Sequence, residues 1–174
     1  SITTAKGGLS AGVAVAARSH YGLGKSAAQP NSPGVQSRLH AAWFPYGIKG
    51  GVHLITVYLW TTEPITSLRN RTLMEALAQL IDNLSGPWVI GADWQNSPEH
   101  ITASRWPEML RGVVHVPANP TCGNNVLDFF IVSDKLAHAV IGVQVISDAG
   151  TTPHHGVRLL LSHGARQATV RRVK

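Results

Sequence analysis

The sequence predicts a layered α/β domain in which several strands surround one well-formed helix. Short apolar runs rich in β-branched residues recur along the chain and are separated by glycine and proline. One segment instead has a helical period. The chain has 174 residues, 44% of them hydrophobic, which is enough for one core. Charged residues make up only 14%, so disorder is excluded, and we expect residues 1–174 to form a single domain.

The first third of the chain predicts two strands and a loop between them. Residues 12–16 form a short apolar run and are expected to be a buried strand. Residues 26–34 contain Pro30, Pro33 and Gly34 and are expected to be a loop. After Gly50 and Gly51, residues 53–60 are β-branched and aromatic, which is typical of a strand.

One amphipathic helix is expected over residues 67–85. Thr66 or Ser67 can cap its start, and the Gly86-Pro87 pair ends it. Its apolar face is formed by Leu73, Leu77, Leu80 and Leu84.

Short strands are predicted to follow the helix. They lie at residues 88–91, 113–116, 126–132, 140–146 and 157–161, with a short helix or turn within 99–111 and a loop over 117–125. Among the five tryptophans, Trp60 and Trp94 can face either core or substrate, and the sequence leaves that choice open.

Several classes of protein are disfavoured by composition. The sequence has no run of 18 apolar residues, so no membrane-spanning helix is expected. Residues 7–17 are uncharged but lack the leucine-rich core of a secretory signal. A single cysteine, Cys122, rules out an intrachain disulfide framework or a multi-cysteine zinc site. We interpret Cys122 as a buried residue and expect an intracellular location rather than a secreted one.

Charge is concentrated at the two ends of the chain. Residues 1–62 and 149–174 contain basic residues and no acid, whereas all nine acids lie between Glu63 and Asp148. The segment 162–174 reads as a basic C-terminal tail. The formal net charge of +6 favours a polyanionic partner such as a nucleic acid, an acidic protein surface or an anionic membrane. The alternative is a solvated tail that aids solubility.

Three places at strand ends can carry chemistry. Asp93 directly follows a buried strand and can orient a nucleophile or hold a hard metal ion. Asp128 lies in an apolar strand, where a carboxylate is costly without a partner. We expect that partner to be a histidine, although backbone N–H groups are the alternative. The pair His154-His155 precedes the last strand and is placed to meet Asp128.

Five segments, taken in order, resemble the endonuclease/exonuclease/phosphatase superfamily, which includes apurinic-site endonucleases and DNase I-like nucleases. Residues 88–95, Trp-Val-Ile-Gly-Ala-Asp-Trp-Gln, are similar to the family's Gly-Asp-Phe-Asn motif, and residues 153–157 are similar to its terminal Ser-Asp-His segment. The other similar segments are residues 7–15, residues 55–59, and Thr121 followed by residues 127–133.

The resemblance implies a DNase I-like sandwich of two mostly antiparallel sheets that hydrolyses phosphodiesters with Mg²⁺ or Mn²⁺. Carried over by position, Tyr58 would contact the phosphate and Asp93 would activate water. Gln95 would take the place of the family's Asn and bind the phosphate. Asp128 would orient His155, which would stabilise the transition state, while His154 would stand beside it in the substrate site.

The chain also departs from the family's pattern. It lacks the family's N-terminal strands and their metal-binding Glu, and Gln95 and His154 replace an Asn and an Asp. We therefore assign no metal ligand and expect weak hydrolysis or none. The sequence therefore leaves three hypotheses open: a phosphodiesterase and two alternatives. One is an inactive family member, a pseudoenzyme, acting as a structural subunit with protein partners. The other is a nucleic-acid-binding module.

Overall fold

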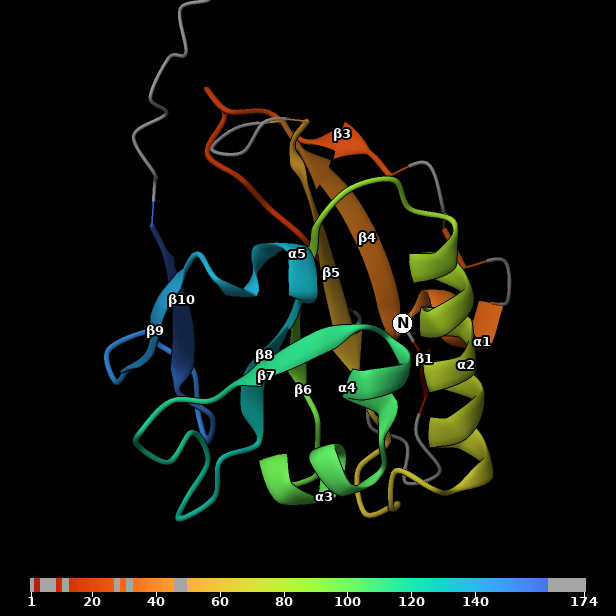
Figure 1. The fold of residues 1–174 in the computed structure, drawn as a ribbon. Coiled ribbons are helices and arrows are strands. Elements are labelled where there is room, and N and C mark those ends of the chain that lie inside the picture. The colour runs from red at the N-terminus through yellow and green to blue at the C-terminus, as the bar shows by residue number, and fades with distance from the viewer. Residues whose placement is uncertain are drawn as a thin grey trace, which may run out of the picture.

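A computed structural model describes residues 2–3, 9–10, 13–26, 29–30, 33–45 and 50–162 of the chain. The described part is a mixed α/β structure whose centre is a six-stranded sheet (Figure 1). The strand order is β3-β4-β5-β6-β8-β7, and every pair is antiparallel except β5 with β6. Its strands are β3 (Gly24–Lys25), β4 (Leu39–Phe44), β5 (Val52–Tyr58), β6 (Trp88–Asp93), β7 (Gly112–His115) and β8 (Asp128–Ser133).

Two smaller sheets and five helices complete the described structure. Strands β9 (Val140–Ile146) and β10 (Gly156–Leu161) form an antiparallel pair, as do the two-residue strands β1 (Ile2–Thr3) and β2 (Leu9–Ser10). The helices are α1 (Pro33–Gln36), α2 (Leu68–Asp82), α3 (Pro98–Ala103), α4 (Trp106–Met109) and α5 (Asp134–Ala137).

Helix α2 forms the crossover between the two parallel strands β5 and β6. Such a pair needs a long connection, and a helix packed on the sheet is its usual form. The Ser67 side chain caps the helix by accepting a hydrogen bond from the Asn70 backbone N–H. Leu73, Met74 and Leu77 are at most 2% exposed and pack in one cluster with apolar residues from one face of the large sheet. Burial of this face, more than intrinsic propensity, stabilises the helix.

The hairpin β9–β10 packs on the opposite face of the large sheet. Leu159 and Leu161 of β10 lie against Val52, Val89 and Val132, which belong to three strands of that sheet. Figure 1 shows α2 and the hairpin on opposite sides of the central strands. The order of layers is therefore helix, sheet, sheet, which confirms the predicted fold class of two mostly antiparallel sheets with an outer helix.

The register of the large sheet brings three candidate residues to one edge. Tyr58 ends β5 and pairs with Asp93, which ends the parallel strand β6. Asp93 in turn pairs with Asp128, which begins the antiparallel strand β8. Paired residues of neighbouring strands point to the same face. The fold thus sets these side chains in a row on the face that also carries β9–β10.

One expectation for the first third of the chain is wrong, and one strand there was missed. Residues 13–16 form no strand, and their side chains alternate between half-buried and exposed. Small alanine side chains bury too little surface to hold this run in a sheet. Conversely, Leu39–Phe44 forms strand β4, which was not predicted because alanines weaken its β pattern. It is held as a strand by pairing with β3 and β5.

The predicted basic surface of the N-terminal part needs one correction. Arg38 is only 6% exposed, and its Nη1 donates to the carbonyls of Tyr58 and Leu59, both at 3.1 Å. Burial lowers the pKa of its guanidinium. The predicted C-terminal tail, apart from Ser162, lies outside the described residues. Among the described residues, no helix is long and apolar enough to cross a membrane.

Candidate functional site

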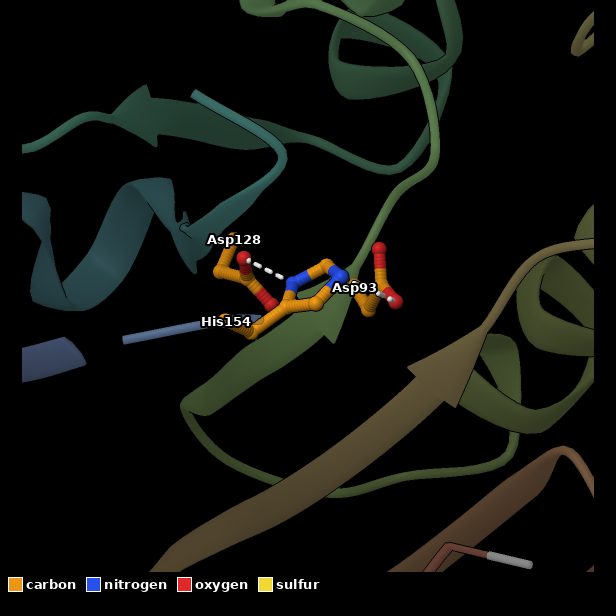
Figure 2. A group of neighbouring side chains, drawn as sticks. All are labelled: Asp93, Asp128 and His154. Atoms are coloured by element: carbon orange, nitrogen blue, oxygen red, sulfur yellow. Dashed lines mark hydrogen bonds and ion pairs between the residues drawn. The ribbon is translucent and has the colours of Figure 1, made fainter. Parts of the chain in front are cut away.

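An Asp–His pair stands at the row of strand ends. His154 lies two residues before β10, and its Nδ1 is 2.7 Å from Oδ2 of Asp128 (Figure 2). An ionised carboxylate only accepts hydrogen bonds, so this contact places a hydrogen on Nδ1 of the imidazole. Nε2 is thereby left facing outward from the pair.

The predicted pairing of Asp128 with His155 is wrong, because the neighbouring histidine makes it. An isolated antiparallel bridge joins His154 to Cys122 and fixes the backbone here in an extended form. Successive side chains of an extended chain point to opposite sides, so only one of two adjacent histidines can face Asp128. The side chain of His155 is exposed, and its backbone N–H donates to the carbonyl of Thr121 at 2.7 Å. The residue before the pairing histidine is therefore Pro153, which offers no ligand atom.

Asp93 faces the free nitrogen of the same imidazole. Nε2 of His154 is 4.0 Å from Oδ2 of Asp93, and the two side chains are 27% and 22% exposed. Figure 2 shows the ring lying between the two carboxylates. Nε2 of a neutral ring and a carboxylate oxygen are both acceptors. A proton, a cation or a hydrogen-bonding substrate group is needed to make their approach favourable.

Gln95 holds the carboxylate of Asp93 through two hydrogen bonds. Its backbone N–H donates to Oδ1 at 3.2 Å, and its Nε2 donates to Oδ2 at 2.5 Å. This arrangement requires Gln95 to adopt φ 50°, a left-handed conformation that non-glycine residues adopt only when surrounding contacts fix it. The resemblance implied that Gln95 binds the phosphate. In the structure its side-chain amide contacts the Asp93 carboxylate instead.

Burial raises the pKa of the Asp93 carboxyl, and the nearby charge of Asp128 adds to this, while Gln95 and His154 act against it. Folding therefore carries a penalty that is absent at low pH, grows as pH rises from the ordinary aspartate range, and is complete above the raised pKa. We expect Asp93→Asn to raise the melting temperature relative to wild type at pH 7, and not at pH 3. Thermal unfolding with EDTA at both pH values measures this. An equal difference at both would contradict it.

Three residues of this site can hold a metal ion. Donor atoms of Asp93, Asp128 and His154 all lie within 4.8 Å of one another. No metal ligand was predicted from the sequence. Two carboxylates and an imidazole suit Mn²⁺ well, and the carboxylates alone suit Mg²⁺. The donors present therefore fit a divalent ion.

Tyr58 lies one strand away from Asp93, beside buried Arg38. The guanidinium of Arg38 lies 4.6 Å from the centre of the Tyr58 ring and 3.5 Å from that of Trp60. These contacts fix the end of β5. The Tyr58 side chain is half-buried, and the described structure gives it no hydrogen bond to the Asp–His pair.

An open hollow of about 340 Å³ adjoins the two carboxylates. The sheet contributes Thr56, Gly91 and Phe130 to its lining, and the segment before and within β10 contributes His155 and Val157. A β-carbon at position 91 would lie 3.1 Å from the Phe130 ring, so glycine there gives the ring room. The hollow offers space for a substrate group beside Asp93 and Asp128.

Two residues that hold the site were not predicted from the sequence as supports. Trp94 is fully buried, and its indole N–H donates to the carbonyl of Phe129 at 3.1 Å, so it faces the core. Thr121 is fully buried beneath the start of β8. The sequence signal for Thr121 was its place in the family pattern, which gave no role.

No protein-family model and no curated protein sequence matches the chain. Its fold does match solved structures. The endonuclease domain of TRAS1, a telomere-specific non-LTR retrotransposon, superposes with TM-score 0.60 at 11% identity, covering 75% of this chain and 66% of that chain. The AP endonuclease LMAP from Leishmania major gives 0.59 at 12% identity over 83% and 62%. The 3'-5' exonuclease NExo from Neisseria meningitidis gives 0.56 at 19% identity over 82% and 70%.

These matches establish the fold. The chain spans 62–70% of the length of these three neighbours. The neighbours are members of one superfamily, and the likeness of this chain to them is one of fold. The chain therefore has the DNase I-like fold of the endonuclease/exonuclease/phosphatase superfamily.

Proposed function

We propose that Asp93, Asp128 and His154 form a site for metal-dependent hydrolysis of phosphodiesters. The observation that carries the proposal is the hydrogen-bonded Asp128–His154 pair whose free nitrogen faces Asp93 across 4.0 Å. A half-buried carboxylate on one side of an imidazole and a second carboxylate on the other is an arrangement that moves protons. In phosphoryl transfer, charge gathers on the phosphate oxygens and must be offset.

In this proposal each member of the site has a separate role. In its imidazolium form, His154 carries a hydrogen on Nε2, which donates to a phosphate oxygen or passes to the leaving oxygen and leaves the ring neutral. Asp128 fixes the tautomer and supports the imidazolium that forms. Asp93 orients the attacking water through a carboxylate oxygen and accepts its proton.

A divalent ion, Mg²⁺ or Mn²⁺, would be held by carboxylate oxygens of Asp93 and Asp128, which leaves Nε2 of His154 for the phosphate. Such an ion supplies neutralisation of phosphate charge. Gln95 donates to both carboxylate oxygens of Asp93 and so fixes their orientation beside the hollow. Tyr58 stands beside it on the next strand and is proposed to contact the phosphate.

Nucleic acid is the proposed substrate. One neighbour, a 3' phosphatase NExo from Neisseria, was solved bound to a product DNA hairpin and matches with TM-score 0.53 at 21% identity over 82% of this chain. The net charge of +6 favours a polyanion. We expect slow turnover, because the described site has only two carboxylates and Pro153 adds no ligand beside His154.

The testing experiment is nicking of supercoiled plasmid with Mn²⁺ or Mg²⁺, in which a single cleavage changes the product. We expect nicking that EDTA abolishes. Asp93→Asn should lower Mn²⁺ affinity, measured from free Mn²⁺ by electron paramagnetic resonance, by at least about tenfold, since even outer partners of metal sites change affinity by about 10–100-fold.

Asp82→Asn is the matched control, because Asp82 is an exposed carboxylate at the end of α2. It should leave both nicking and Mn²⁺ affinity unchanged. Plasmid that stays intact with either metal, while Mn²⁺ still binds, would favour the inactive or binding-only alternatives. Nicking that survives EDTA would contradict the role of the metal.

A further inference from the structure

We propose that Thr121 is the positioning residue that sets Asp128 and His154 in register. Thr121 lies in the loop between β7 and β8 and is 0% exposed. It lies outside the two segments that carry the pair, yet it forms hydrogen bonds with the backbone of both. The inference rests on the proposed function only where it treats the Asp128–His154 pair as catalytic. Its test measures the contact between the two side chains and needs no catalysis.

The hydroxyl of Thr121 fixes the start of β8. Its Oγ1 accepts hydrogen bonds from the backbone N–H of Leu127 at 2.9 Å and of Asp128 at 3.0 Å. Two donors on one oxygen define the position of the peptide that carries the Asp128 side chain. Without that oxygen both N–H groups lose their partner, and such a loss is costly in a buried place.

The backbone of Thr121 fixes the histidine segment. Its carbonyl accepts a hydrogen bond from the His155 N–H at 2.7 Å, and the next residue, Cys122, forms an isolated bridge with His154. The loop itself is closed by the N–H of Thr121, which donates to the Asn125 carbonyl at 2.8 Å. The backbone at His154 and His155 is therefore bound to the same short loop that fixes Asp128.

The consequence is a direct link between two segments that are 26 residues apart in sequence. Without this link, the carboxylate at the strand end and the imidazole in the loop could each change position relative to the other. Catalytic groups need to be held to within about 0.5 Å of their working geometry by supports of this kind. Thr121 supplies that support through one hydroxyl and one carbonyl, without touching the space where a substrate would sit.

The test reads the tautomer of His154 by long-range ¹H–¹⁵N correlation of the ring, in metal-free protein at a pH where the ring is neutral. In wild type we expect predominantly the Nδ1–H form, which the Asp128 contact requires. Thr121→Val removes the accepting oxygen at nearly constant volume. We expect it to lower the ratio of Nδ1–H to Nε2–H form by about tenfold, within the range that the loss of buried partners produces.

Three further variants make the result specific. Thr121→Ser keeps the oxygen and should keep the wild-type ratio, and Asp128→Asn marks the signal of a broken pair. Leu77→Ala creates a cavity under α2, away from the site, and should destabilise the fold while leaving the ratio unchanged. An unchanged ratio in folded Thr121→Val, or an equal change in Leu77→Ala, would overturn the proposal.

The same readout separates this inference from the proposed function. Loss of the tautomer preference in Thr121→Val supports positioning even if no phosphodiester is cleaved. Should Thr121→Val not fold, Thr121→Ala removes the same oxygen and carries the measurement. Failure of both variants to fold would make Thr121 a residue of the core and would overturn its assignment to the pair.

Discussion

Replacing His154 by alanine is expected to lower metal-dependent phosphodiester hydrolysis by at least about 100-fold, the lower end of the effect of a positioned acid or base. His154 alone of the two adjacent histidines contacts Asp128, and its Nε2 alone faces Asp93. The variant removes the group that offsets charge on the phosphate and leaves the Asp128 carboxylate without its partner.

His155→Ala is the comparison variant, since it makes the same change one residue along the chain, at a side chain that lines the hollow but makes no described contact with Asp128. The side chain of His155 is exposed, and its described hydrogen bond uses only the backbone N–H, which alanine keeps. We expect its rate to fall by clearly less than the roughly 100-fold expected for His154→Ala, because its side chain makes no described contact with the Asp–His pair. Both variants are compared under plasmid-nicking conditions with Mn²⁺ in excess.

The pattern across the two variants is the decisive result. Loss of activity in His155→Ala with retention in His154→Ala would restore the pairing predicted from the family's pattern and contradict the observed geometry. An equal loss of activity in the two variants would mean that activity depends on the backbone of this segment and not on the side chain of His154. Melting temperatures measured alongside exclude unfolding as the cause.

Much of the fold could be predicted because local patterns and tertiary packing agree after residue 50. The apolar period at Leu73 and Leu77 predicted helix α2, and the capping role of Ser67 is confirmed. The run 140–146 predicted strand β9 with the observed bounds. Before residue 50 the patterns are weaker. Strand β4 is formed by its pairing with β5, which no local signal of Leu39–Phe44 contains.

The site was predicted in part for the same reason. A lone carboxylate in an apolar strand indicated that Asp128 needs a partner, and the partner is a histidine of the predicted pair. Which of the two histidines it is depends on the direction of a side chain, and that is set by the bridge between Cys122 and His154. No spacing along the sequence contains this information. The contact of Gln95 with Asp93 likewise depends on a left-handed backbone angle.

Trp94→Ala is expected to lower the free energy of unfolding by about 3–5 kcal/mol, the usual cost of removing a large buried aromatic side chain. The indole is 0% exposed, stacks on Phe129 with ring centres 5.5 Å apart, and donates to the Phe129 carbonyl. Urea unfolding followed by circular dichroism measures the change. Leu68→Ala, at a residue that is 71% exposed, should change it by less than about 0.5 kcal/mol.

The burial of Trp94 also explains why Asp93 can stand at the rim of the site. The backbone N–H of Trp94 donates to the Leu127 carbonyl at 2.8 Å and extends the pairing of β6 with β8 by one residue, so the indole points into the core and Asp93 points away from it. Trp94→Phe keeps most of the apolar volume and loses the N–H donor, so we expect a smaller loss, about 1–3 kcal/mol, from the lost hydrogen bond and the smaller ring. If Trp94→Ala cost less than about 1 kcal/mol, the indole would lie outside the core, and the anchoring of Asp93 by its neighbour would fail with it.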